Sequence, residues 1–371
     1  MKMTGIIFSN IYDHAMGALT AKRTVASLPF GGRYRQIDFV LSNMVNSNIN
    51  NIGVITKYNY QSLMDHLGSC TPWDLNRKNS RLAILPPFVS GNTGLYKGKL
   101  EALYTAISFL ERYGAEYVLL SDSTTICNID YERILKEHIK SGKDITAVVQ
   151  KIKEDTIREY DLVIEADENL IPVSLAVGFK PRTGQYAALG MYVMRTKELI
   201  EVIRDSVARG LCYLEKEFIQ KQFNIGKLTI NISEFTGSVL INNSIQSYYE
   251  NSLKLMDENV RNDLFSPDNP IYTKVRDEFP TLYEKGSLVN DCLVADGCEI
   301  SGTAENCVIF RDVKIKKGAV VTNSIVMQGT VIGEDSSINC AILDKDVTVS
   351  PGTKLMGVTV SPIIIQKGER I

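Results

Sequence analysis

Residues 315–355 read IKKGAVVTNSIVMQGTVIGEDSSINCAILDKDVTVSPGTKL, and residues of the same kind recur in and beside this stretch every 17 positions. The recurring sets are Ile315, Ile332 and Val349; Val321, Ile338 and Leu355; Gly318, Asp335 and Gly352; and Ile309, Val326 and Leu343. Ordinary antiparallel strands would not place several registers on one period, whereas a parallel β-helix does so because three short strands make each turn. The pattern therefore predicts a left-handed parallel β-helix of hexapeptide repeats.

The first two-thirds of the chain alternate short apolar runs with amphipathic stretches. The runs that indicate buried parallel strands are residues 4–8, 51–56, 117–120 and 145–149. The clearest helix covers residues 99–113 and stops before Gly114; its apolar face is formed by Leu100, Leu103, Ile107 and Leu110. This alternation predicts a doubly wound α/β domain, in which ligands bind at the carboxyl ends of the strands. The loops after residues 4–8 and 117–120 are therefore the expected site.

A polar segment with three prolines, SPDNPIYTKVRDEFPT (266–281), separates the two patterns and indicates a linker. At 371 residues the chain is long enough for two domains with separate cores. We therefore expect the α/β domain over residues 1–256, a linker over 257–285 and the β-helix over 286–371.

Composition excludes several classes of function. A hydrophobic content of 44% and a net charge of −2 favour a soluble globular protein and give no reason to expect nucleic acid or a membrane as partner. We expect no signal peptide and no membrane span. Seven cysteines without a C-x-x-C pair favour free thiols and the cytoplasm. With only His14, His66 and His138, the chain has little scope for a histidine zinc site or a Ser-His-Asp triad.

Two long segments carry a family resemblance. Residues 28–59 read LPFGGRYRQIDFVLSNMVNSNINNIGVITKYN, and residues 292–310 read CLVADGCEISGTAENCVIF. Both resemble ADP-glucose pyrophosphorylases (glucose-1-phosphate adenylyltransferases), the first at the start of their nucleotidyltransferase-like domain and the second at the head of their β-helix. The resemblance covers essentially the whole chain. It implies the family reaction, in which ATP and glucose 1-phosphate give ADP-glucose and pyrophosphate.

The phosphate-binding loop of this family has lost its functional residues here. Aligned back from PFGG (29–32), the family's glycine pair corresponds to Asn10 and Ile11, the next glycine to Asp13 and the threonine to His14. The arginine corresponds to Ala15 and the lysine to Val25. A phosphate cradle needs glycines so that N–H groups can approach the anion, and cations that neutralise it. The resemblance thus implies a scaffold whose catalytic positions are degenerate.

The metal-binding aspartates of the family are also replaced. In STTICNIDY (123–131) the first position is Thr124, and in GSVLINNS (237–244) the second is Ile241. Asp122 lies two positions before Thr124, and it could replace the missing aspartate only by swinging into its place, because a two-residue shift in a strand-end loop displaces the carboxylate. The alignment implies that this chain has no metal site and no cofactor, and that Mg²⁺ belongs to a catalytic partner.

Sugar recognition is altered as well. In LYKGKLEA (95–102), Lys99 and Leu100 replace a threonine and an alanine of the family. Other family residues that contact the sugar are replaced by Glu101, Phe179, Ala188 and Tyr213. If the chain still binds a sugar phosphate, the resemblance implies that the binding residues are Lys180, Gly98, Glu101 and Gly190.

A regulatory site is weakened but not erased. The family often binds phosphorylated effectors through basic residues, of which this chain keeps Arg33 and Arg35. Asn50 and Asn51 stand where an arginine pair is usual, and Lys57 replaces a glutamine. We expect an effector or anion site formed by Arg33, Arg35 and Lys57.

Loss of chemistry on an intact scaffold indicates the non-catalytic regulatory subunit of a bacterial ADP-glucose pyrophosphorylase, assembled with a homologous catalytic chain as a heterotetramer. Weak binding of nucleotide, sugar phosphate or effector stays open. One alternative is an active sugar-1-phosphate nucleotidyltransferase with a rewired metal and phosphate site. Another is a hexapeptide acyltransferase, which usually needs a histidine base, and none follows His138.

Overall fold

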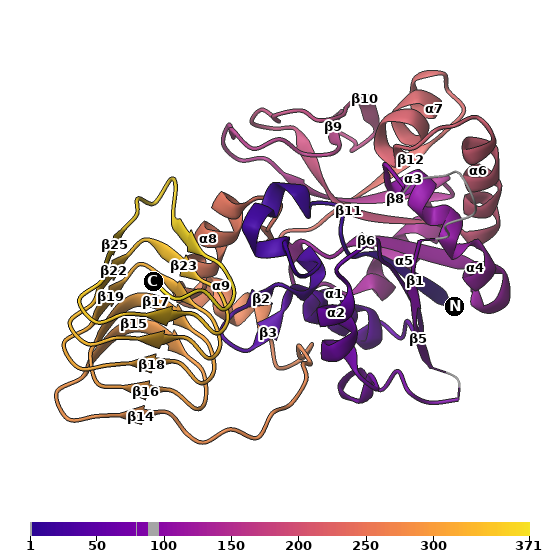
Figure 1. The fold of residues 1–371 in the computed structure, drawn as a ribbon. Helices are drawn as coiled ribbons and strands as arrows, with labels where there is room; N and C mark the ends of the chain where they lie inside the picture. Colours follow the sequence, from indigo (N-terminus) through magenta and orange to yellow (C-terminus); the bar gives the residue numbers. More distant parts are fainter. Residues whose placement is uncertain (1, 79, 88–95) are drawn as a thin grey trace.

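The computed structural model of the protein describes residues 2–78, 80–87 and 96–371. It consists of an α/β domain followed by a left-handed parallel β-helix, whose coils stack beside that domain (Figure 1). In the described parts of the chain, every helix is too short or too polar to cross a membrane.

A nine-stranded sheet forms the centre of the α/β domain, with the order β10–β9–β11–β6–β1–β4–β5 and with β8 and β12 joined through β11. Its strands are β1 (Met3–Phe8), β4 (Asn51–Ile55), β5 (Arg81–Leu85), β6 (Tyr117–Asp122), β8 (Ile145–Lys151), β9 (Val163–Ala166), β10 (Pro172–Ala176), β11 (Tyr186–Arg195) and β12 (Ile230–Glu234). The four predicted strands are present as β1, β4, β6 and β8. Strand β1 pairs in parallel with both β4 and β6, so the loops that follow β1 and β6 meet at one edge.

The sheet is mixed and not wholly parallel. Strand β11 runs antiparallel between β6 and β8. The antiparallel direction of β11 could not be predicted from the sequence, because a strand buried on both faces shows the same continuous apolar run in either direction.

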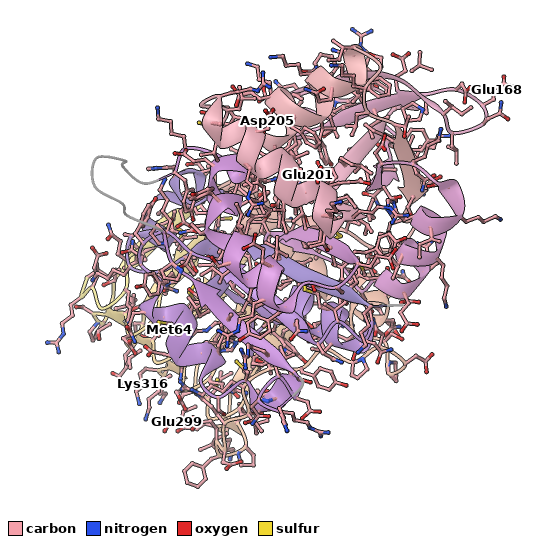
Figure 2. The ribbon with its side chains drawn as sticks, turned by 90° about the vertical axis from the view of Figure 1, so that its right-hand side faces the viewer. Met64, Glu168, Glu201, Asp205, Glu299 and Lys316 are labelled. Atoms are coloured by element: carbon pink, nitrogen blue, oxygen red, sulfur yellow. The ribbon has the colours of Figure 1, made fainter. Side chains whose placement is uncertain are left out.

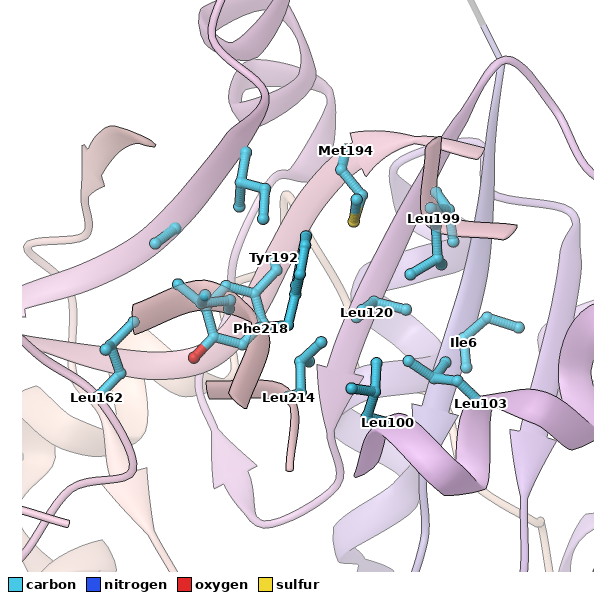
Figure 3. Packing of buried hydrophobic residues seen from close by; sticks show 14 of the residues in the cluster. Ile6, Leu100, Leu103, Leu120, Leu162, Tyr192, Met194, Leu199, Leu214 and Phe218 are labelled. Carbon is cyan, nitrogen blue, oxygen red and sulfur yellow. The ribbon is translucent and has the colours of Figure 1, made fainter. Parts of the chain in front are cut away.

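Helices cover both faces of the sheet, as a doubly wound fold requires. One face packs against α3 (Lys99–Ala102), α4 (Ile107–Tyr113), α6 (Thr196–Ala208) and the π-helix η5 (Leu214–Gln220). The other packs against α1 (Gln36–Asn46), α2 (Gln61–Leu67) and α5 (Tyr131–Ser141). Figure 3 shows the first face, where Leu100 and Leu103 lie near Ile6 and Leu120 of the sheet.

The predicted helix over residues 99–113 is divided into three segments. A 3-10 segment, η4 (Leu103–Ala106), separates α3 from α4. Its Thr105 Oγ1 donates a hydrogen bond of 2.8 Å to the carbonyl of Ala102, and such local bonds compete with regular helical pairing. The helix ends before Gly114 as predicted. Glycine is needed at this position because a Cβ would lie 2.2 Å from the carbonyl oxygen of Leu110.

Short elements complete the α/β domain and surround the sheet. They are η1 (His14–Thr20), η2 (Val25–Ser27), β2 (Pro29–Phe30), β3 (Tyr34–Arg35), η3 (Thr71–Trp73), β7 (Thr125–Ile126), α7 (Lys221–Asn224), β13 (Leu240–Ile241), α8 (Ile245–Leu253) and η6 (Lys254–Met256).

The β-helix has the register that the 17-residue period predicts. Ile315 pairs with Ile332 and Ile332 with Val349, while Val321 pairs with Ile338 and Ile338 with Leu355. Its strands are β14 (Leu282–Tyr283), β15 (Leu288–Val294), β16 (Glu299–Ile300), β17 (Thr303–Ile309), β18 (Lys314–Ile315), β19 (Val320–Thr322), β20 (Ile325–Val326), β21 (Val331–Ile332), β22 (Ser337–Asn339), β23 (Ala341–Leu343), β24 (Thr348–Val349), β25 (Lys354–Met356) and β26 (Ile363–Ile365). The repeating set Gly318, Asp335 and Gly352 lies at corners with positive φ, where glycine and aspartate are tolerated.

The segment predicted as a linker, 257–285, is more structured than expected. It contains helix α9 (Glu258–Leu264) at its start and strand β14 near its end. The extended part between them lies along α1, where the backbone N–H of Tyr272 donates to Ser42 Oγ and Thr273 Oγ1 donates to Asp38 Oδ2. The linker is thus fixed to the α/β domain.

The two domains share a core at their junction. Phe30 and Phe39 of the α/β domain pack in one buried cluster with Val308 and Ile325 of the β-helix. A buried ion pair also crosses the junction, because Nη2 of Arg23 lies 2.6 and 2.5 Å from the two carboxylate oxygens of Asp344.

Candidate functional site

The loop after β1 is folded around one of its own carboxylates. The buried Asp13 accepts a hydrogen bond of 2.7 Å at Oδ1 from the backbone N–H of Val25. Burial raises the pKa of Asp13 to about 7, although the hydrogen bond from Val25 opposes this shift. The carboxylate thus accepts a hydrogen bond from a backbone amide of the kind that binds phosphate in such loops.

Neither of the two positions that carry cations in the family carries a cation here. Ala15 is exposed on η1. Val25 is fully buried in the cluster at the domain junction, beside Leu28 and Phe30. A charged side chain would therefore be costly at position 25.

The two degenerate metal positions lie together, as the alignment implies. Strand β7 pairs with β13, and the backbone N–H of Asn242 donates to the carbonyl of Thr124 at 2.9 Å. Thr124 and Ile241 line one small cavity of about 20 Å³. Magnesium prefers carboxylate and other oxygen ligands, and these positions offer a hydroxyl and an alkyl chain, so they do not fit the metal. Among the described residues, no group of three or more His, Cys, Asp and Glu side chains is arranged to hold a metal ion.

A buried group of charges lies beside these neutral positions. This Lys99 cluster consists of Lys99 at the start of α3, Asp122 at the end of β6, Asp161 before β9 and Glu215 in η5. Nζ of Lys99 lies 2.8 Å from Oδ2 of Asp122, 3.1 Å from Oδ2 of Asp161 and 2.7 Å from Oε1 of Glu215. The hydroxyl of Tyr12 donates to the same Asp161 oxygen at 2.5 Å. Asp122 does approach the site, but its partner is an ammonium group.

The electrostatics of the Lys99 cluster favour a charged lysine. Burial alone would lower the pKa of Lys99, but the carboxylates, Asp122 foremost, outweigh this effect and raise the pKa well above its usual value. Burial raises the pKa of Asp122 to about 7 against the attraction of Lys99. Despite burial, Lys99 and the hydrogen bond from Tyr12 hold the pKa of Asp161 below its usual value.

Gly190 belongs to this cluster and not to an open sugar site. Its φ is +70°, and a Cβ at this position would lie 2.3 Å from Oδ2 of Asp122. The glycine therefore lets the Asp122 carboxylate lie directly against strand β11.

A cavity of about 540 Å³, the central cavity, opens beside the Lys99 cluster. Its described lining includes Asn10, Ile11, His14, Lys57, Tyr58, Tyr96, Lys97, Gly98, Lys99, Asp161, Tyr213, Glu215 and Lys216. Nδ2 of the buried Asn10 has no hydrogen-bond partner among the described residues.

The structure does not bring the four expected sugar-phosphate residues together. Gly98 lines the central cavity, whereas Gly190 lines the small cavity beside Thr124 and Ile241. Glu101 accepts the backbone N–H of Lys97 at 2.7 Å and so stabilises the start of α3. The Lys180 side chain is exposed after β10.

A second, strongly basic cavity lies between the α/β domain, the linker and the β-helix. This junction cavity has a volume of about 110 Å³. Its basic lining is Arg33, Arg35, Lys274, Arg276, Arg311 and Lys345, and among the described lining residues the only carboxylate is Asp65. Lys57 lies in the central cavity and donates to the carbonyl of Tyr96 at 2.9 Å, so the expectation that it joins Arg33 and Arg35 is wrong.

The cations of the junction cavity are poorly compensated. Burial, reinforced by Arg35 and Arg23, lowers the pKa of Lys345 to about 7. Burial also lowers the pKa of Arg35 to about 10. The buried Nε of Arg311 has no hydrogen-bond partner among the described residues, and it lies 3.7 Å from Oδ2 of the exposed Asp296. These features suit the binding of an anion with more than one charge.

Sequence reasoning missed four of the six cations of the junction cavity. Two come from the linker, Lys274 and Arg276, where nothing in the pattern indicated a site. For the other two a signal existed. Arg311, Gln328 and Lys345 follow one another at the 17-residue period, so they stack along one side of the β-helix, and all three line the cavity.

Comparison with known proteins agrees with the fold. The nucleotidyl transferase family model matches residues 16–247, and the GlmU-like C-terminal hexapeptide model matches residues 280–360. The protein is therefore a nucleotidyltransferase-type α/β domain joined to a hexapeptide β-helix.

Individual relatives narrow this class. The chain is 35% identical to the glycogen biosynthesis protein GlgD of Bacillus subtilis over 99% of its own length and 96% of that protein. It is 37% identical to GlgD of Geobacillus stearothermophilus with the same coverage, and 32% identical to a glucose-1-phosphate adenylyltransferase of Fervidobacterium nodosum over 95% of this chain and 85% of that one. The chain belongs to the glucose-1-phosphate adenylyltransferase (ADP-glucose pyrophosphorylase) family and is similar to its GlgD members.

Proposed function

We propose that this chain is a regulatory, catalytically inactive subunit of ADP-glucose pyrophosphorylase in glycogen biosynthesis. Its partner is a homologous catalytic chain that binds Mg²⁺ and makes ADP-glucose and pyrophosphate from ATP and glucose 1-phosphate. The two chains assemble as a heterotetramer in the cytoplasm, and this chain carries no cofactor. The similarity to two GlgD proteins along almost the whole chain supports the pathway.

The observation that carries the inactive role is that the protein fills the catalytic region with its own charges. Asp13 accepts a hydrogen bond from a loop amide, and the ammonium of Lys99 pairs with Asp122 at the end of β6 and with Glu215 in η5. The positions expected to hold metal and phosphate, Thr124, Ile241 and Val25, are neutral and buried. Nucleotidyl transfer depends on preorganised cations that neutralise phosphate, and none of these positions supplies one.

The alternative of an active transferase with a rewired site would need Asp122 and its neighbours as metal ligands. The ammonium of Lys99 lies within 3.1 Å of three such carboxylates, which argues against that use. A hexapeptide acyltransferase is also disfavoured, because His14, His66 and His138 all precede the β-helix.

As part of the same proposal, the junction cavity binds a phosphorylated effector or another multiply charged anion. Arg33 and Arg35 come from the α/β domain, and Arg311 and Lys345 come from the β-helix. An anion bound between them would contact both domains at once. It could therefore favour one arrangement of the subunits over another, which is the requirement for allosteric coupling.

Two measurements test the function. The purified chain alone should form ADP-glucose only at background level, and turnover above about 1 per second would contradict the inactive role.

After co-expression with a homologous catalytic chain, the two chains should elute together with the mass of a heterotetramer by light scattering. The assembled enzyme should differ from the catalytic chain alone in its apparent affinity for substrates or effectors. Separate elution, or unchanged kinetics at saturating amounts of this chain, would refute the regulatory role.

A further inference from the structure

We propose that Cys292 and Cys307 are a reversible redox pair: a small disulfide such as oxidised glutathione converts their two thiols into a disulfide bond that ties the first coil of the β-helix to the second. Both thiols are free in the structure. The inference rests on contacts within the β-helix alone. It goes beyond the regulatory function proposed above and does not depend on it.

The two cysteines face one another across neighbouring strands. Cys292 in β15 and Cys307 in β17 are direct partners in a parallel ladder, so their side chains lie on the same face, where both pack in the apolar core of the β-helix. Neighbouring strands lie roughly 4.7–4.9 Å apart, and disulfides join residues whose Cα atoms are about 4.4–6.8 Å apart. The pair therefore has the backbone separation that a disulfide needs.

The two thiols differ in their access to solvent. Cys307 is fully buried, whereas Cys292 is partly exposed. The difference arises because β15 is an edge strand: among the described strands it pairs with β17 alone, so no strand of this chain covers its other side. A reagent in solution therefore reaches Cys292 first.

Hydrogen bonding between the two thiols makes Cys292 the nucleophile of the pair. This contact lowers the pKa of Cys292 below its ordinary value against the effect of burial, and together with burial it raises the pKa of Cys307 well above its ordinary value. The thiolate, and not the thiol, attacks a disulfide. Burial instead raises the pKa of four other cysteines, which are Cys70, Cys127, Cys212 and Cys298.

The reaction is thiol–disulfide exchange in two steps. The Cys292 thiolate attacks one sulfur of oxidised glutathione, which forms a mixed disulfide and releases one glutathione thiolate. Cys307 then loses its proton to the released thiolate and attacks the Cys292 sulfur, which breaks the mixed disulfide and releases the second glutathione. Two electrons pass from the cysteine pair to the oxidant, so the products are one protein disulfide and two reduced glutathione molecules. An excess of reduced thiol reverses both steps.

The bond would form beside the junction of the two domains. Leu293 and Val308, the residues that follow the two cysteines, pack with Phe30 of the α/β domain in the core that both domains share. Oxidation would therefore fix the first two coils to one another at the place where the β-helix contacts the α/β domain.

The decisive experiment treats the reduced, purified chain with oxidised glutathione at neutral pH, blocks the remaining thiols with iodoacetamide and maps disulfides by mass spectrometry. Cleavage at Asp296, Glu299 and Glu305 places Cys292 and Cys307 on separate peptides. These peptides should be joined in most chains and released by dithiothreitol. A pair that stays reduced, or a stable glutathione adduct on Cys292, would overturn the proposal.

Two single variants test the order of the steps. Cys307→Ser keeps a hydroxyl that can donate to Cys292 but cannot complete the exchange, so a glutathione adduct should accumulate on Cys292. Cys292→Ser should leave the buried Cys307 reduced. The matched control is Cys298→Ser, which changes a buried cysteine near the pair in sequence and should still form the disulfide. Equal glutathione uptake by the Cys292→Ser and Cys307→Ser variants would refute these roles.

Two measurements on the natural chain keep the test decisive if a serine variant does not fold. Iodoacetamide should label Cys292 at least about threefold faster than Cys212, which is also partly exposed but has a raised pKa. The oxidised chain should unfold roughly 3 °C or more above the reduced chain, because the cross-link restricts the unfolded state. Labelling of Cys292 no faster than that of Cys212, or an oxidised chain no more stable than the reduced one, would contradict the proposal. These readouts use this chain alone, so failure here leaves the regulatory proposal standing.

Discussion

The Lys99 cluster and the junction cavity both contain buried charged groups, but these groups are paired with opposite charges in the cluster and mostly unpaired in the cavity. In the first, one ammonium is surrounded by carboxylates of the same chain. In the second, six cations face one carboxylate among the described lining residues. The contrast teaches that buried charges are paired within the chain beside Thr124 and Ile241, whereas most cations of the junction cavity have no carboxylate partner in its described lining.

The consequence is visible in the ionisation of two lysines. Carboxylates raise the pKa of Lys99 well above its usual value, whereas burial among like charges lowers that of Lys345 to about 7. An anion in the junction cavity would remove this strain, while an anion at the strand ends would meet Asp13 and the carboxylates of the Lys99 cluster. Ligand binding is therefore favoured at the junction.

The strongest test of the comparison puts an unpaired cation back where the family has one. Val25→Lys should lower the free energy of unfolding by roughly 3–5 kcal/mol, the cost typical of an uncompensated buried charge, because Val25 is fully buried. Val25→Met, similar in length but uncharged, should cost only about 1–3 kcal/mol. Urea denaturation measures both values. Equal stability of the two variants would show that the region still accommodates a cation.

A second test removes the internal anion of the same region. The pKa of Asp13 is near 3.8 in the unfolded chain and about 7 in the folded one, so the folded state keeps a proton that the unfolded state loses, and this residue makes stability fall as pH rises from about 4 to about 7. Asp13→Asn should therefore be more stable than the natural chain by about 2–4 kcal/mol at pH 8, with the gain disappearing towards pH 4. The measurement is urea denaturation across this range. Asp277→Asn, at an exposed linker residue, is the control and should show no such trend.

A third and smaller effect tests the junction cavity. Inorganic phosphate should raise the unfolding temperature of the natural chain, and Arg311→Gln should weaken this binding roughly tenfold, since a charge-assisted hydrogen bond is lost. Lys316→Gln changes a lysine on the outside of the β-helix (Figure 2) and should leave binding unchanged. If both variants weaken binding equally, the effect reflects net charge and not the cavity.

Regular parts of the fold could be predicted because they repeat. The 17-residue period fixed the register of the β-helix, since residues one period apart must stack for the apolar side chains to share a core. The strand positions in the α/β domain followed from buried apolar runs. The antiparallel direction of β11 did not, because burial pattern carries no information on direction.

The residues of the candidate site were likewise predictable only in part. Alignment with the family located Ala15, Val25, Thr124 and Ile241, since these positions lie in motifs that are contiguous along the chain. Neither the role of Lys99 nor the full junction cavity could be found from these motifs. The partners of Lys99 are 23, 62 and 116 residues away, and the junction cavity combines both domains with the linker.

The sequence by itself determined the two-domain architecture, the β-helix and the loss of the family's charged groups, because each is written in local pattern or in aligned motifs. Only the tertiary structure decided what replaces those groups. Pairing of buried charges depends on distances of about 3 Å between residues far apart in the chain, and such distances are set by how the strands, helices and coils pack. That packing surrounds Lys99 with three carboxylates and leaves six cations of the junction cavity with one carboxylate, Asp65, in its described lining.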